Sequence, residues 1–232
     1  MQELTEIEID RKLGRWWLGR HIEVVTAVLL GFVSCMTAYA GFQSALYEST
    51  MAAAFSRAQV LSTQAESLYL AANQDYTQEA QLWGTLSELA LDMESADPAT
   101  AARATSRYNT LWADVVTDNF AAAIERANAT NEANPDDYVN PLDDEIYLDT
   151  LFGPSNEKAD KAVAQTAIGD RANSLGDQLG LYTVLMTISL FLLGVAAVVK
   201  RNLIKFLLVG FSVSVFVVAT ILTLTVPFIA LS

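Results

Sequence analysis

The chain has 232 residues, of which 52% are hydrophobic and only 18% are charged, and its mean hydropathy is +0.28. These values exclude an ordinary soluble domain, which carries more charge and fewer apolar residues. The single histidine, His21, and the single cysteine, Cys35, exclude an intrachain disulfide and a multi-histidine metal site, so we expect neither enzyme activity nor a cofactor.

The first 21 residues mix acids and bases with scattered apolar residues, and Trp16 and Trp17 directly precede the first long apolar stretch. This pattern predicts an amphipathic helix at 1–21 that lies in the cytoplasmic interface of a membrane and is anchored by its indoles. A frayed tail is the alternative. We find no pattern of a removable signal peptide here.

Three stretches without acidic or basic residues predict transmembrane helices. They are 24, 22 and 27 residues long and cover 24–47, 178–199 and 206–232. Each exceeds the roughly 20 apolar residues that a helix needs to cross a bilayer. We therefore predict spans at 22–47, 178–199 and 206–232, with a region at 48–177 between the first two and a basic turn at 200–205.

Basic residues flank these spans on one predicted side only, which fixes the expected orientation because cytoplasmic flanks carry the excess of Lys and Arg. The amino terminus and the turn are then cytoplasmic, and 48–177 and the carboxyl terminus are exoplasmic. The residues concerned are Arg11, Lys12, Arg15, Arg20, Lys200, Arg201 and Lys205.

The region between the first two spans is strongly acidic. Residues 42–178 hold 7 basic and 22 acidic side chains, a net charge of −15 against −13 for the whole chain. Such a field repels nucleic acid and attracts cations or basic partners, although surface solvation alone also explains it. The acidic loop at 136–149 could offer oxygen ligands to a cation, but its spacing matches no known calcium loop, and a solvated loop is the alternative.

Helical periodicity continues beyond the first span. Apolar residues recur at steps of three and four through Met51, Ala54, Ala58, Leu61, Ala65, Leu68 and Ala72. We expect a break at 73–75, with Asp75 as the N-cap of a second helix. Asp97-Pro98 predicts the start of a third helix that extends to Ala127.

A loop is expected at 128–140, and a short helix at 143–151 that Gly153-Pro154 ends. Nothing in the sequence stops a helix between Ser155 and Val199. The predicted fold class is therefore an all-α membrane protein, with three transmembrane helices and an exoplasmic antiparallel helical bundle formed by extensions of spans one and two.

Small residues recur at heptad spacing in spans one and two, where they allow two helix backbones to approach closely in lipid. We predict that these two small-residue seams face each other. An interface between identical subunits is the alternative. The seam residues are Ala27, Gly31, Ser34, Ala38, Gly41 and Ala45 on span one, and Gly169, Gly176, Gly180, Thr183, Thr187, Gly194 and Ala197 on span two and its extension.

Span three carries hydroxyl residues, of which Ser212, Thr220 and Thr223 share one side and are candidates for lining a pore. The alternative is that these hydroxyls bond to their own helix backbone.

Several short segments are similar to a set of uncharacterised bacterial membrane proteins, over about residues 24–228. The segments are Tyr39-Ala40-Gly41-Phe42-Gln43, Asp177-Gln178-Leu179, Tyr182-Thr183-Val184-Leu185 and the final span up to Pro227. The resemblance implies a bacterial cytoplasmic (inner) membrane and no known activity.

The sequence thus suggests a non-enzymatic cell-envelope membrane protein whose outward helical domain mediates self-assembly or partner binding. Its expected partners are the lipid bilayer, further copies of the chain or another envelope protein, but not nucleic acid. The alternative is a subunit of an oligomeric cation channel, in which the acidic region forms the outer vestibule.

Overall fold

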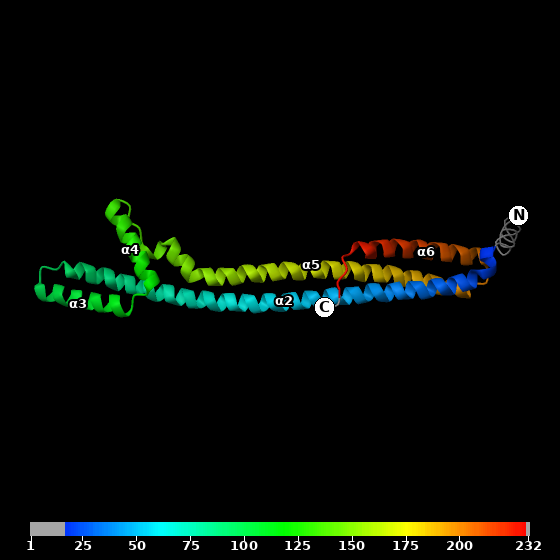
Figure 1. The fold of residues 1–232 in the computed structure, drawn as a ribbon, viewed down its shortest axis with the longest axis horizontal. Coiled ribbons are helices and arrows are strands. Elements are labelled where there is room, and N and C mark those ends of the chain that lie inside the picture. Colours follow the sequence, from blue (N-terminus) through cyan, green and yellow to red (C-terminus); the bar gives the residue numbers. More distant parts are fainter. Residues whose placement is uncertain (1–16, 231–232) are drawn as a thin grey trace. The chain divides into compact units, whose positions relative to one another are not determined.

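The structure, a computed structural model, describes residues 17–230, and most of the amphipathic helix predicted at 1–21 lies outside them. The described residues are helical and contain no strand, which confirms the all-α prediction (Figure 1). The helices are α2 (Trp17–Met93), α3 (Pro98–Asp114), α4 (Asp118–Ala133), the 3-10 helix η1 (Pro141–Asp143), α5 (Glu145–Val198) and α6 (Asn202–Thr225).

Three of these helices, α2, α5 and α6, are long and apolar enough to cross a membrane. The third ends at Thr225, earlier than the predicted limit of 232. Pro227 explains the difference, because a proline disfavours helical geometry in the residue before it and donates no backbone hydrogen bond. Lys205 lies in α6 rather than in a free turn, and it is 5% exposed.

The chain divides into two compact units. Residues 17–55 and 166–230 form the first, here called the span unit, and residues 56–165 form the second, here called the acidic unit. Both α2 and α5 contribute to each unit, so each unit contains segments that are far apart in the sequence.

In the span unit, α2 and α5 run antiparallel and α6 packs against both (Figure 1). The Ser44 hydroxyl of α2 donates a hydrogen bond of 3.0 Å to the Gly176 carbonyl of α5. The Phe55 ring packs on Gly169, where an added Cβ atom would lie 2.6 Å from Phe55 Cε1, so this close contact requires glycine. The apolar core of the unit consists of Val33, Ala40, Met186, Leu193, Phe216 and Ala219.

A pair of serines joins α5 to α6. Ser189 and Ser212 are both fully buried, and their hydroxyl oxygens lie 2.7 Å apart. The Ser189 hydroxyl also lies 2.8 Å from the Ser212 carbonyl, and the Ser212 hydroxyl lies 2.7 Å from the Ser189 carbonyl. The two polar side chains therefore satisfy each other inside an apolar core, where an unpaired hydroxyl would be costly.

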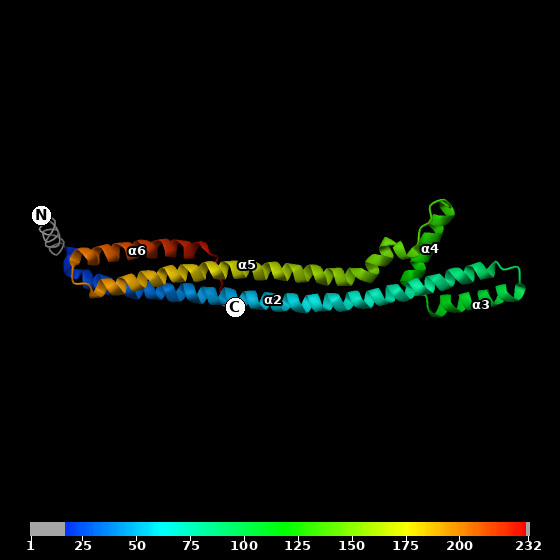
Figure 2. The same cartoon turned by 180° about the vertical axis from the view of Figure 1, so that it is seen from behind.

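After α6 the chain crosses to α2, as Figure 2 shows from behind. The Tyr47 hydroxyl donates a hydrogen bond of 2.6 Å to the Pro227 carbonyl. The Gln43 amide pairs with the backbone of Ile229, accepting at 3.2 Å and donating at 3.4 Å. Two side chains of α2 thus replace the backbone partners that this non-helical segment lacks.

In the acidic unit, α2 continues through the predicted break at 73–75 as far as Met93, so that prediction is wrong. Asn, Gln and Asp cost only a few tenths of a kcal/mol relative to good helix formers, and no Gly or Pro accompanies them. The stripe of Ala58, Ala65 and Ala72 is buried, whereas two other members of the predicted stripe are not, since Leu61 is half-buried and Leu68 is exposed. Its packing keeps the helix intact across 73–75.

The third helix begins at Pro98 as predicted, and the Asp97 carboxylate caps it by accepting from the backbone N–H groups of Ala99 and Thr100. It does not extend to Ala127, because the chain breaks between α3 and α4. Thr117 caps α4 by accepting a hydrogen bond of 3.2 Å from Phe120 N. The β-branched residues Val115, Val116 and Thr117, which lie between the two helices, lower the helix propensity at this break.

The loop predicted at 128–140 is shorter, because α4 continues to Ala133. The predicted stop at Gly153-Pro154 is also wrong, since α5 runs through Pro154 to Val198. A proline removes one backbone hydrogen bond and bends a helix without always ending it. The Ser155 hydroxyl donates a hydrogen bond of 2.7 Å to the Phe152 carbonyl beside this proline, and α5 bends near its start in Figure 1.

We predict that Ser189→Ala or Ser212→Ala lowers the free energy of unfolding of the detergent-solubilised protein by about 1 kcal/mol, because each removes the contact between the two hydroxyls and one of the two hydroxyl-to-carbonyl hydrogen bonds. Ser214→Ala is the matched control, since that exposed hydroxyl bonds only to the Gly210 carbonyl of its own helix. The double variant should be less destabilised than the sum of the single variants. Additive losses in denaturant titrations would contradict the reciprocal pairing.

Candidate functional site

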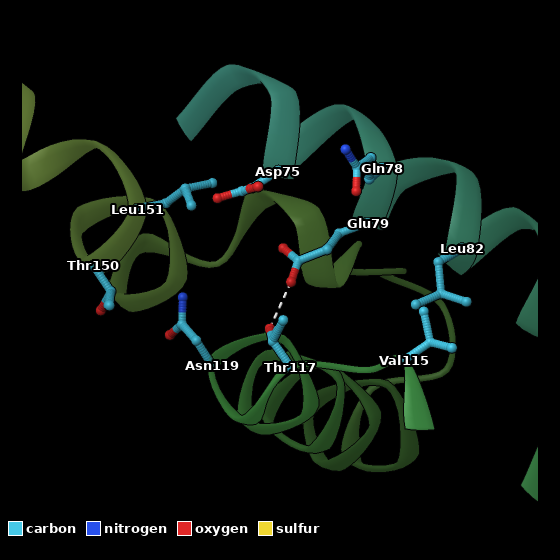
Figure 3. A pocket seen from close by; sticks show the side chains of 9 residues that line it. All are labelled: Asp75, Gln78, Glu79, Leu82, Val115, Thr117, Asn119, Thr150 and Leu151. Carbon is cyan, nitrogen blue, oxygen red and sulfur yellow. Dashed lines mark hydrogen bonds between the residues drawn. The ribbon is translucent and has the colours of Figure 1, made fainter. Parts of the chain in front are cut away.

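The most unusual polar group of the acidic unit is Glu79, which is only 7% exposed on α2. Its carboxylate accepts a hydrogen bond of 2.5 Å from the Thr117 hydroxyl (Figure 3). It accepts a second hydrogen bond of 2.5 Å from the Tyr147 hydroxyl. Thr117 is the N-cap of α4 and Tyr147 lies in the first turns of α5. One buried carboxylate therefore joins three helices.

Tyr147 is fully buried and lies beside two other rings, with centroid distances of 5.4 Å to Phe120 and 6.4 Å to Tyr76. Burial raises the pKa of Tyr147 strongly, and the hydrogen bond to Glu79 raises it further. The phenol therefore stays protonated and donates to Glu79 at every physiological pH.

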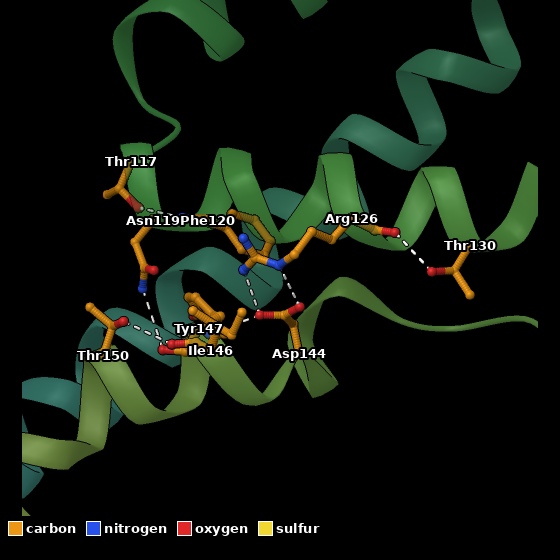
Figure 4. A network of polar contacts seen from close by, with 9 residues as sticks. All are labelled: Thr117, Asn119, Phe120, Arg126, Thr130, Asp144, Ile146, Tyr147 and Thr150. Carbon is orange, nitrogen blue, oxygen red and sulfur yellow. Dashed lines mark hydrogen bonds and ion pairs between the residues drawn. The ribbon is translucent and has the colours of Figure 1, made fainter.

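An ion pair holds the start of α5 against α4 (Figure 4). The Arg126 guanidinium donates to both carboxylate oxygens of Asp144, at 2.8 Å from Nε and 2.6 Å from Nη2. Asp144 also accepts 2.8 Å from the backbone N–H of Tyr147, and Asn119 donates 3.3 Å to the Tyr147 carbonyl. The hydrogen bond from Arg126 lowers the pKa of Asp144 below its usual range. These contacts fix the position of Tyr147 opposite Glu79.

A pocket of about 370 Å³ lies beside Glu79 (Figure 3). Two carboxylates, four neutral polar side chains and three apolar side chains line it, and no Lys, Arg or His is among them. The lining consists of Asp75, Gln78, Glu79, Leu82, Val115, Thr117, Asn119, Thr150 and Leu151. The pocket is therefore acidic, with Leu82 and Val115 together on one side and Leu151 on the other (Figure 3).

Glu79 is not among the residues predicted from the sequence, although the sequence carries a signal for it. Glu79 follows Ala58, Ala65 and Ala72 at intervals of seven residues and precedes Leu86, which is 1% exposed. An acidic residue at a position of a buried stripe must find hydrogen-bond partners, and such residues are rare in helix cores. That exception marks the site.

The acidic side chains of the loop at 136–149 do not come together in a cation-binding site. Asp136, Asp137 and Asp143 are exposed, and Asp144 is engaged by Arg126. Within residues 17–230, no group of three or more His, Cys, Asp or Glu side chains is placed to hold a metal ion.

The prediction that the two small-residue seams face each other is wrong for span one. Five seam residues of α2 are exposed and Gly41 is half-buried, whereas α2 buries Ile22, Thr26, Val33, Ala40, Ser44 and Tyr47. The exposed residues are Ala27, Gly31, Ser34, Ala38 and Ala45. The seam therefore lies to one side of the packed face.

On α5, only part of the predicted seam is buried. Gly169 and Gly176 pack against Phe55 and Tyr47 of α2. Gly180, Thr183 and Gly194 are half-buried, and Thr187 and Ala197 are exposed. A Cβ atom added at Gly31, Gly41, Gly180 or Gly194 would meet no atom within 4 Å, so these glycines make no close contact within the chain.

The candidate pore-lining residues lie on the packed side of α6. Ser212 is fully buried against Ser189, and Thr223 is 4% exposed and donates to the Ala219 carbonyl at 2.8 Å. Thr220 is half-buried. This placement contradicts a pore-lining role for Ser212 and Thr223, because the chain's own helices already cover them.

We predict that Glu79→Ala destabilises the protein by about 2–3 kcal/mol, since it removes the acceptor of two buried hydroxyls and opens a small cavity. Glu88→Ala, which changes an exposed glutamate of the same helix, should alter stability by less than about 0.5 kcal/mol. Denaturant titrations followed by the fluorescence of Trp83 and Trp112, which pack on this core, measure the effect. Equal losses in the two variants would show that Glu79 has no such role.

The ion pair between Arg126 and Asp144 should make the stability of the protein depend on pH in the acidic range. Because the pKa of Asp144 is lowered in the folded state, its stabilisation is fully present above the unfolded-state pKa of about 3.9 and is lost as pH falls through the lower folded value. Below about pH 4, wild-type stability should therefore fall more steeply than that of Asp144→Asn. Arg126→Gln should give an intermediate profile, because the backbone N–H groups of Tyr147 and Ile146 still lower the pKa of Asp144. A variant profile as steep as that of the wild type would contradict this role.

Comparisons of the chain with protein-family models, with curated proteins and with solved structures found no match. The pocket beside Glu79 and the exposed small-residue seam of α2 therefore rest on the geometry of this chain alone. These two features, one in each unit, are the surfaces from which a function can be argued.

Proposed function

We propose that this chain is a non-enzymatic membrane protein of the bacterial cell envelope that self-assembles through the small-residue seam of α2. In this proposal α2, α5 and α6 cross the cytoplasmic membrane, and the acidic unit lies outside it as a helical bundle built on the extensions of α2 and α5. The small-residue interface between identical subunits is thus preferred to the pairing of seams within one chain.

The observation that carries the proposal is the exposure of the seam. Ala27, Gly31, Ser34, Ala38 and Ala45 are exposed, while the buried face of α2 is already occupied by α5 and α6. Phe32 of α2 contacts Phe216 of α6 at a centroid distance of 5.7 Å, which places α6 on the side of α2 away from the seam. The seam therefore remains free for another helix.

The small residues of the α2 seam are better suited to contact with a second helix than to contact with lipid chains. Lipid chains solvate large apolar side chains as well as small ones, so a lipid-facing surface has no need of glycine and alanine at heptad spacing. A second helix gains from them, because small residues let the backbones come close enough for extensive van der Waals contact. The same seam on a second copy is self-complementary, as a twofold interface requires.

Two charge patterns support the proposed orientation. The basic residues of the α5–α6 connection match those before α2, as the positive-inside rule requires for a shared cytoplasmic side. Lys205 Nζ lies 3.7 Å from Glu23 Oε1, so the start of α6 and the start of the α2 span lie at the same end of the span unit. The excess of acidic residues lies in the other unit.

The test is the oligomeric state of the full chain in detergent, measured by size-exclusion chromatography with light scattering. We expect the wild type to be a dimer or a larger oligomer, and Gly31→Leu to shift it strongly towards monomer because the added side chain separates the two backbones. Gly210→Leu is the matched control, since Gly210 is exposed on α6 with open space around it. It should leave the oligomer unchanged.

Cys35 offers an independent readout, because it is an exposed native thiol one residue from Ser34 of the seam. Mild oxidation in native membranes should give a disulfide-linked dimer in the wild type and in Gly210→Leu, and much less of it in Gly31→Leu. A monomeric wild type, or an oligomer equally sensitive to both leucines, would refute assembly through the seam.

A further inference from the structure

The pocket beside Glu79 belongs to the acidic unit, whereas the seam on which the proposed assembly rests belongs to the span unit. We propose that this pocket binds a small organic cation, an alkylammonium ion whose charged group lies against Glu79 and Asp75 and whose apolar stem lies against Leu82 and Val115.

The pocket carries negative charge that no basic side chain balances. Glu79 is only 7% exposed, and both of its hydrogen-bond donors, Thr117 and Tyr147, are neutral hydroxyls. Asp75 lies one helical turn before it and lines the same pocket, which contains no basic side chain. A buried carboxylate is stabilised far more by a cation than by neutral donors alone. The pocket therefore has a charge that a ligand can neutralise.

The hydroxyls of Thr117 and Tyr147 hold the Glu79 carboxylate in one orientation. Tyr147 and Thr117 each donate to a different carboxylate oxygen, Oε2 and Oε1 respectively. Each carboxylate oxygen has two lone pairs, so both retain an acceptor site after these bonds. The carboxylate is thus fixed in place while still able to accept from an ammonium N–H. Such preorganisation lowers the entropic cost of binding.

Size and lining favour an organic cation over a metal ion. A cavity of about 370 Å³ is far larger than a single ion needs and falls within the range of small-molecule pockets, roughly 300–1,000 Å³. Metal sites need several convergent ligands, and the described residues contain no group of three or more side chains suited to that role. The apolar side formed by Leu82 and Val115 suits a short alkyl stem, and Gln78, Asn119 and Thr150 offer further acceptors.

The surroundings also act against anions. The acidic unit carries a large excess of acidic residues, so its field raises the local concentration of cations and repels negatively charged ligands. The amino end of α4 reaches this site, but Thr117 caps it by accepting from Phe120 N. That helix end therefore stabilises the Glu79 carboxylate through Thr117 and does not offer its N–H to an exogenous anion.

The test is isothermal titration of the full-length protein in detergent at constant ionic strength, with n-butylammonium as the probe. We expect saturable binding of one ligand per chain, and weaker binding of methylammonium because it lacks the apolar stem. Asp75→Asn should weaken n-butylammonium binding about tenfold while the protein remains folded, since Asp75 is exposed. Asp92→Asn, which changes an exposed aspartate of α2 outside the pocket, should bind like the wild type.

Three results would overturn the proposal: no saturable binding at millimolar n-butylammonium, equal weakening by Asp75→Asn and Asp92→Asn, or full competition by millimolar Mg²⁺ or Ca²⁺. The second would indicate attraction to the acidic surface as a whole, and the third a metal site. The Gly31→Leu variant should bind as the wild type does, because Gly31 lies in the span unit. Loss of assembly and loss of binding are therefore distinguishable.

Discussion

The buried stripe of α2 is the constraint on which both units depend. Its fully or nearly buried positions recur every seven residues through each unit, and each one faces the core of that unit. In the span unit they are Thr26, Val33, Ala40, Tyr47 and Ala54, and in the acidic unit they are Ala58, Ala65, Ala72, Glu79 and Leu86. A helix that keeps one register must place every residue at these positions in a core, whatever its polarity.

The polar members of that stripe show how each unit meets this requirement. Thr26 donates to the carbonyl of its own helix at Ile22, over 2.7 Å, which is the simplest solution in an apolar core. Glu79 cannot be satisfied locally and needs donors from two other helices. The organisation of α4 and α5 around one carboxylate follows from this need, and it leaves an acidic pocket beside the site. A buried acid at a core position is thus both a cost to stability and the origin of the proposed binding site.

Local rules were sufficient where one residue determines one feature. Asp97 was predicted to start a helix and does so, because its carboxylate bonds directly to the N–H groups that follow it. The three long apolar stretches were predicted correctly as helices able to span a membrane, since length and charge alone decide that property. Local rules failed at 73–75 and at Gly153-Pro154, where α2 and α5 continue because packing against neighbouring helices outweighs the loss of helix propensity. That loss is a few tenths of a kcal/mol per residue at 73–75 and about 3 kcal/mol at Pro154.

The sequence by itself thus determined that the chain is helical, that three helices are long and apolar enough for a membrane, and that α2 carries a buried stripe beyond its first span. Only the tertiary structure decided which of two adjacent faces of α2 is packed. The stripe of Ala54 and Ala58, extended towards the amino terminus, leads to Ala40 and Val33 and not to the small-residue seam. In the structure Ala40 and Val33 are buried. It also brought Glu79, Thr117 and Tyr147 together from segments 38 and 68 residues apart. No local pattern encodes such contacts, because they depend on the relative positions of whole helices.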